Sequence, residues 1–226
     1  MRIIEPSFEI LHMAEEEEVY RLLEIAARNC YKSENKIAQG TAKDLLRRLM
    51  KTGHESVIEH ISISVRIICD RGITHELVRH RLCSFSQEST RYANYSKEKF
   101  GKEITVIRPF FWEKGSQAYE LWADAMQNAE WAYFDLLSEG AKPQEARSVL
   151  PNGLKTDIVT TANIRNWKHI FNLRCSKASH PQIRQIMLPM LAEFYKRLPV
   201  LFEAQYEKYE SAIKVIKAIE FAEAKQ

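Results

Sequence analysis

The sequence has few of the features that mark secreted, metal-binding or membrane proteins. Cysteine is scarce, with four residues in 226, and no two of them stand two or three positions apart. This excludes the paired spacing of a zinc ribbon or a redox motif. No apolar run is long enough to cross a bilayer, and residues 1–6 contain no apolar segment typical of a secretory signal. We therefore expect a cytoplasmic protein with reduced thiols and no membrane partner.

Glycine and proline are also sparse, with seven of each, and no stretch rich in Gly, Ser or Pro reads as a linker. Hydrophobic residues make up 45% of the chain, which is enough for a substantial core. We expect residues 1–226 to form a single domain.

The sequence has little excess of positive over negative charge. Its 33 basic and 30 acidic residues give a formal net charge of +3, too balanced for a protein that coats nucleic acid by charge alone. A strong positive potential must therefore be local, and a local basic cluster suits a small phosphorylated ligand.

Hydrophobic periodicity predicts an α+β domain with more helix than strand. Strict alternation over residues 61–67 indicates a half-buried strand. A charged, helical tail from about residue 206 to the end suits either a solvated arm or an oligomer contact. The other predicted helices are 14–29, 41–50 with Thr41 as N-cap, 73–81, 116–138, 166–173 and 181–197, and the other extended segments are 103–108 and 157–161.

The densest polar cluster lies between residues 79 and 92, which contain three arginines, a histidine and three serines. It follows the end of a predicted helix and is polar on every face, so it is difficult to bury without a ligand. Arginine guanidinium groups match phosphate and carbonyl oxygens, and serine hydroxyls can complete such a cradle. A solvated helix end with surface charges is the simpler alternative.

The spacing within this cluster favours the functional interpretation. The segment reads R-H-R-x-x-S-x-x-x-x-S-x-R and resembles the signature of flavin-dependent thymidylate synthases. All six specified positions match: Arg79, His80, Arg81, Ser84, Ser89 and Arg91. Further segments resemble the family's G-H-x-S-x-x-E-H, A-R-x-x-L-P and C-terminal site elements, in family order: 53–60, 146–151, 163–165 and 171–174.

The resemblance implies reductive methylation of dUMP to dTMP. FAD would be the cofactor, NADPH would reduce it, and methylenetetrahydrofolate would supply the carbon. The family's homotetramer, with sites shared between subunits, is implied as well. The implied FAD-contacting residues are Ser56, Arg79, His80, Arg81, Gln87, Asn163, Arg165 and His169. The implied substrate-binding residues are Glu76, Arg79, Gln87, Glu88, Ser89, Thr90, Arg91, Arg147 and Arg174.

Arg174 is the residue we expect to activate the substrate. Methylation at C5 of uracil needs electron density pushed there from the ring, and a guanidinium beside a ring oxygen favours the enolate-like form. Arginine stays protonated, so it acts by electrostatics and not as a base. Without the family match, an arginine that neutralises a helix C-terminus would be a fair alternative.

Two other side chains in the signature invite a nucleophilic role. Cys83 stands at a position that the family pattern leaves variable, so we interpret it as packing. Ser89 has no evident activating base nearby in the sequence, so we assign it to nucleotide binding with a catalytic role left open. At positions 86 and 87 this chain has Ser-Gln, whereas many members of the family have Asn-Glu there.

The histidines give no metal motif. His54, His60, His75 and His80 lack the helical i, i+4 pair with glutamate that zincins use, so no metal is expected. The rival function is an RNA-binding module that uses the cluster's arginines with Phe85 and Tyr92, although the enzyme interpretation expects no nucleic-acid partner.

Overall fold

A computed structural model describes residues 1–223 of the chain, and the side chains of residues 1–216. The last three residues of the predicted charged tail, 224–226, lie outside the described residues. The strands are β1 Arg2–Ile4, β2 Ser7–His12, β3 Ser62–Asp70, β4 Ser84–Gln87, β5 Thr105–Ile107 and β6 Lys155–Asn163. The α-helices are α1 Glu16–Asn29, α2 Thr41–Lys51, α3 Arg71–Leu77, α4 Gln117–Ser138, α5 Pro143–Ala146, α6 Ile164–Arg174, α7 Pro181–Arg197 and α8 Pro199–Glu223. The short 3₁₀ helices are η1 Glu34–Lys36, η2 Glu55–His60, η3 Glu98–Phe100 and η4 Arg147–Val149.

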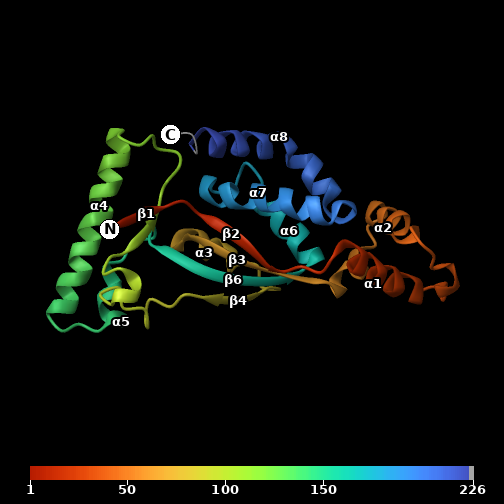
Figure 1. The fold of residues 1–226 in the computed structure, drawn as a ribbon, viewed down its shortest axis with the longest axis horizontal. Helices are drawn as coiled ribbons and strands as arrows, with labels where there is room; N and C mark the ends of the chain where they lie inside the picture. Colours follow the sequence, from red (N-terminus) through yellow and green to blue (C-terminus); the bar gives the residue numbers. More distant parts are fainter. Residues whose placement is uncertain (224–226) are drawn as a thin grey trace. The chain divides into compact units, whose positions relative to one another are not determined.

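The strands form two sheets (Figure 1). In the four-stranded sheet the order is β2-β3-β6-β4, and β1 pairs in parallel with β5 in the other. The two long central strands, β3 and β6, alternate buried and less buried residues along most of their length. That alternation is the period-two pattern of a sheet with one face covered.

The chain divides into two compact units. Unit 1 comprises residues 1–9, 66–81 and 85–160, and unit 2 comprises 10–65, 82–84 and the described residues from 161 onward. The core of unit 1 gathers residues from β5, α4 and the loop after β4, including Tyr95, Val106 and Tyr133. The ring of Tyr95 packs against the rings of Phe100 and Tyr133, with centroids 5.2 and 5.7 Å apart.

The core of unit 2 is built on packed helices. Helices α6, α7 and α8 contact one another, and Figure 1 shows α7 beside α8. Their buried aromatic side chains meet edge to face or stacked, with ring centroids 5.2–5.9 Å apart, a geometry that adds to the free energy of apolar burial. These residues are Trp167, Phe171, Phe194 and Phe202.

Most predicted elements are present, with shifts at their ends. The predicted helix 181–197 has the observed bounds of α7, whose first residue, Pro181, lacks the N–H that a first turn leaves unpaired. The prediction of helix as far as Arg81 was wrong, because α3 ends at Leu77 and the backbone N–H of His80 closes a turn onto Leu77 O at 3.1 Å. Thr41 is the first residue of α2 and not its N-cap, a position that Gly40 occupies with φ of +84°.

The predicted α+β class is confirmed, since 55% of the structure is helix and 16% is strand. The structure divides into two compact units, and whether these form the predicted single domain stays a prediction. Within the described residues, no helix combines the length and the apolar character needed to cross a membrane.

Candidate functional site

The segment that follows β4 in unit 1 carries most of the predicted nucleotide-binding residues. Gln87, the last residue of β4, donates through Nε2 to Thr74 Oγ1 at 3.0 Å and to Thr156 Oγ1 at 3.2 Å. Thr74 donates its only hydroxyl proton to Arg71 O at 2.9 Å, so its oxygen can only accept from Gln87. This network fixes the amide orientation of Gln87 and leaves its carbonyl oxygen for another donor.

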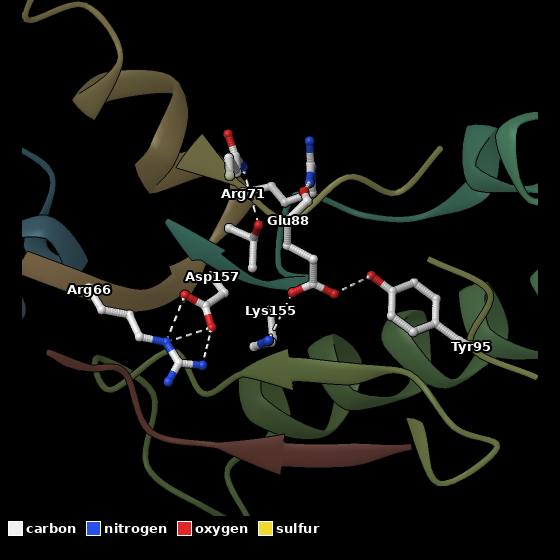
Figure 2. Close-up of polar contacts among 8 residues, drawn as sticks. Arg66, Arg71, Glu88, Tyr95, Lys155 and Asp157 are labelled. Carbon is white, nitrogen blue, oxygen red and sulfur yellow. Dashed lines mark hydrogen bonds and ion pairs between the residues drawn. The ribbon is translucent and has the colours of Figure 1, made fainter. Parts of the chain in front are cut away.

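Glu88 is the next residue, and both its backbone and its side chain form hydrogen bonds within the chain (Figure 2). Its carboxylate accepts from Lys155 Nζ at 2.8 Å and from the Tyr95 hydroxyl at 3.3 Å. Its N–H donates to Asp157 O at 2.8 Å. The Asp157 carboxylate in turn accepts from Arg66 Nε at 2.8 and 3.0 Å. A charge-assisted network therefore ties the end of β4 to β6 and β3.

Two further contacts join this segment to α5 and η4. Arg147 Nη1 donates to Thr90 Oγ1 at 3.4 Å, and Arg91 Nε donates to Gln144 Oε1 at 3.1 Å. Ser89 Oγ accepts the N–H of Arg91 at 3.3 Å. The structure thus brings together two segments that are more than fifty residues apart in sequence, and each carries an exposed arginine. Two guanidinium groups on neighbouring segments can bind one dianionic phosphate.

The Arg-His-Arg segment lies in the turn between α3 and β4. Arg79 and Arg81 are exposed, whereas His80 is buried, with 6% of its surface accessible. Arg79 and Arg81 are therefore accessible to a ligand, and the flavin contact of His80 stays a prediction. Glu76, on α3, is partly buried.

In unit 2, the predicted flavin-binding residues lie on α6 and η2. Asn163 is the N-cap of α6, and its Oδ1 accepts the N–H of Asn166 at 2.9 Å, which satisfies one unpaired donor of the first turn. Arg165, in that turn, is 52% exposed and forms an ion pair with Glu59 of η2. Ser56 on η2 and His169 on α6 are exposed. Within unit 2, the structure therefore places these residues on η2 and α6, which contact each other.

A buried lysine joins the same two elements. Lys168, on α6, has 8% of its side chain exposed and donates to Glu55 of η2. Its Nζ also lies 3.5 Å from Met50 Sδ. Glu55 Oε2 lies 4.0 Å from Arg165 Nε, so the carboxylate stands between two cations. Because a buried lysine needs a charged partner, this pair constrains how α6 meets η2.

Arg174 is the last residue of α6 and is partly buried. That position agrees with both sequence interpretations, since a cation at a helix C-terminus is favourable on its own. Its role as the activating residue stays a prediction.

Cys83 lies in the signature but is poorly suited to nucleophilic attack. Burial raises the pKa of its thiol to about 11, although the hydrogen bond from Asn166 Nδ2 to Sγ, at 3.0 Å, opposes that shift. A thiol with this pKa is almost fully protonated near neutral pH, and the thiolate is the reactive form. The structure supports the packing interpretation.

Sequence reasoning missed several hydrogen-bonded and ion-paired residues that lie next to the predicted site residues. Lys155, Tyr95 and Thr74 in unit 1, and Glu55 and Lys168 in unit 2, have no spacing or motif that marks them. Only tertiary structure pairs them with their partners. The described residues contain no group of three or more His, Cys, Asp or Glu side chains that could hold a metal ion.

Comparison with known proteins gives a consistent result. A family profile described as thymidylate synthase complementing protein matches residues 11–200. A flavin-dependent thymidylate synthase of Pyrococcus abyssi is 37% identical over 163 residues, which cover 72% of this chain and 66% of that protein. Its counterpart in Geobacter sulfurreducens is 35% identical over 185 residues, covering 79% of this chain and 78% of that protein.

Solved structures give the same fold. The crystal structure of the UMP/dUMP methylase PolB from Streptomyces cacaoi, bound with 5-Br dUMP, aligns with a TM-score of 0.73. It is 24% identical, and the alignment covers 92% of this chain and 98% of that one.

The chain spans just under two thirds of the length of the Pyrococcus abyssi relative. Profile, relatives and fold agree, and the chain belongs to the family of flavin-dependent thymidylate synthases.

Proposed function

We propose that this protein methylates dUMP to dTMP as a flavin-dependent thymidylate synthase. Methylenetetrahydrofolate supplies the carbon, and NADPH supplies the electrons that reduce FAD. The chain's relatives are named flavin-dependent thymidylate synthases. A cytoplasmic homotetramer, with sites shared between subunits, completes the proposal.

The meeting of two arginine-bearing segments in unit 1 carries the proposal. The hydrogen bonds from Arg147 to Thr90 and from Arg91 to Gln144 hold both segments side by side. dUMP has one dianionic phosphate, which two guanidinium groups can bind, and a uracil edge that needs both donors and acceptors. The constrained carbonyl of Gln87 is a suitable acceptor for a uracil or ribose donor.

The donor set also fits FAD. Its pyrophosphate needs cations and its ring carbonyls need donors. Arg79, Arg81 and Arg165 are exposed cations, and Ser56 and His169 are exposed polar groups. These residues are the proposed contacts of the flavin, which supplies hydride chemistry when bound. Arg79 and Arg81 lie in the turn after α3 in unit 1, and the other three lie on η2 and α6 in unit 2.

Arg174 activates the substrate in this scheme. Its permanent charge beside a uracil carbonyl stabilises negative charge that develops on the ring, so C5 becomes the nucleophilic carbon. Cys83 takes no part, because its thiol stays protonated. Ser89 binds the nucleotide, and its Oγ stabilises the turn through the N–H of Arg91.

The direct test is formation of dTMP by the purified protein. A preparation loaded with FAD, dUMP, methylenetetrahydrofolate and NADPH should yield dTMP by chromatography with mass detection, and omission of any one substrate should abolish it. The protein should also show the visible absorption band of a bound flavin.

The rival function predicts a different outcome. An RNA-binding module should take up no flavin and should bind single-stranded RNA with a strong dependence on salt. Absence of both flavin uptake and dTMP formation, with salt-sensitive RNA binding, would overturn the enzymatic proposal.

A further inference from the structure

Glu88 is the one carboxylate inside the proposed nucleotide-binding run 87–91. Its backbone and carboxylate polar atoms all have partners within the chain. The N–H donates to Asp157 O, and the backbone carbonyl accepts from Arg71 Nη1 at 3.4 Å. One carboxylate oxygen accepts from Tyr95 and the other from Lys155. Figure 2 shows the carboxylate pointing toward Lys155 and Tyr95.

The electrostatics of a phosphate ligand argue against direct contact with this carboxylate. Glu88 lies three residues from Arg91, which the proposed function assigns to the phosphate. An unpaired carboxylate there would repel a dianion and weaken the local positive potential. Lys155 neutralises Glu88, and both side chains are largely buried, with 24% of Lys155 and 19% of Glu88 exposed.

The partners of Glu88 belong to the rigid part of unit 1. Tyr95 lies in the core, where its ring packs against Phe100 and Tyr133. Burial, followed by the charge of Glu88, raises the pKa of the Tyr95 hydroxyl, so the phenol remains a donor. Lys155 begins the central strand β6. The carboxylate therefore joins the ligand-bearing segment to the core and to the sheet.

We propose that Glu88, Lys155 and Tyr95 form a positioning network that holds Ser89 and Arg91 in place for the nucleotide, and that the Glu88 side chain does not itself bind the substrate. This revises the expectation that Glu88 is a ligand. It adds Lys155 and Tyr95 as functional residues that act through the segment. The expected change in the KM for dUMP rests on the proposed function, whereas hydrogen exchange can test the network independently of that function.

The test compares Lys155→Met, Glu88→Gln and Tyr95→Phe with Lys214→Met. Lys214 forms an exposed i, i+4 ion pair with Glu210, so it is a matched control outside the site. Two measurements are made on the FAD-loaded protein: steady-state kinetics with dUMP, and backbone hydrogen exchange over residues 84–91. Tyr95→Phe keeps the core packing and removes only the hydroxyl donor, so it tests the network if a more drastic variant fails to fold.

Loss of a charge-assisted hydrogen bond should raise the KM for dUMP about tenfold in Lys155→Met and in Glu88→Gln, with kcat changed by about twofold or less. Tyr95→Phe should raise it by about threefold, as expected for a neutral donor. Hydrogen exchange over 84–91 should accelerate in all three variants and stay unchanged in Lys214→Met, while flavin absorbance is retained. The double variant Glu88→Gln/Lys155→Met should be no worse than the worse single variant, because both changes break the same network.

The outcomes separate this inference from the proposed function. If Lys155→Met and Tyr95→Phe leave both KM and hydrogen exchange unchanged while Glu88→Gln raises KM, Glu88 is a direct ligand and the network is wrong. If the wild-type protein forms no dTMP but the variants accelerate exchange, the proposed function fails and the network stands. If exchange over 84–91 is unchanged in every variant, the network fails whatever the activity.

Discussion

Lys168 and Glu55 form an ion pair in which the lysine is almost completely buried and the glutamate is not. The lysine side chain is 8% exposed and the glutamate side chain 30%. The pair joins α6 to η2, the two elements of unit 2 that carry Ser56, Arg165 and His169. Because the two partners differ in their access to water, removal of each should have a different cost.

Glu55→Gln should therefore destabilise the protein more than Lys168→Met. The first change leaves a buried ammonium without a carboxylate, and we expect the free energy of unfolding to fall by about 2 kcal/mol or more. The second leaves a carboxylate that water can reach and replaces the lysine stem with an apolar chain, so a loss of about 1 kcal/mol or less is expected. Denaturant unfolding measures both, with Glu210→Gln as an exposed control that should change by about 0.5 kcal/mol or less. Equal losses in the two variants would contradict this asymmetry.

Gln87→Glu tests the orientation of the amide. A carboxylate cannot donate to Thr74 and Thr156, and Thr74 could donate to it only by releasing Arg71 O. The free energy of unfolding at neutral pH should fall by about 1 kcal/mol. Lower pH, which protonates the new carboxyl, should reduce the difference from wild type. A variant as stable as wild type at neutral pH would mean that the two threonines do not require a donor at position 87.

Arg174→Lys should lower dTMP formation at least about 100-fold, because lysine keeps the charge but lacks the planar fork that stabilises charge on the ring. FAD absorbance should be retained. Arg197→Lys is the control, since Arg197 pairs with Glu193 on the surface of α7 and should leave turnover unchanged. Near-normal turnover in Arg174→Lys would reduce Arg174 to a helix-terminal charge.

Cys83→Ser should keep substantial dTMP formation, because the proposed reaction needs no thiolate at this position. The pKa of about 11 adds a pH dependence. Since the raised pKa keeps the thiol protonated, alkylation of Cys83 should be slow near neutral pH and accelerate as the pH rises toward about 11. Exposed Cys30 should react earlier in the same peptide-mapping experiment. A folded, flavin-bound Cys83→Ser protein without activity would reopen the nucleophilic interpretation.

The proposed shared site predicts complementation between two inactive proteins. Arg147→Ala and Arg174→Ala homotetramers should each be nearly inactive. If a site takes Arg147 from one chain and Arg174 from another, mixed subunits should regain about a quarter of wild-type activity, because each arginine comes independently from an intact chain about half the time. Subunit exchange is verified by mass spectrometry. No recovery after verified exchange would show that both arginines come from the same chain.

The family, the α+β class and most of the elements could be predicted from the sequence alone. Local signals were sufficient for these, since alternation in β3 and Pro181 at the start of α7 depend on residues close together in the chain. The spacing of Arg79, Ser89 and Arg91 was equally local, and it led to the reaction class.

Packing alone shows which side chains contact the candidate site residues. The family resemblance implied Glu88 as a substrate-binding residue, and the structure adds its ion pair with Lys155, which lies 67 residues away. Glu55 and Lys168 are separated by 113 residues, and neither has a local signature. Ion pairs and hydrogen bonds of this kind depend on distances that arise only when strands and helices pack. A pattern within a short window cannot contain them, and so the supporting network had to come from the fold.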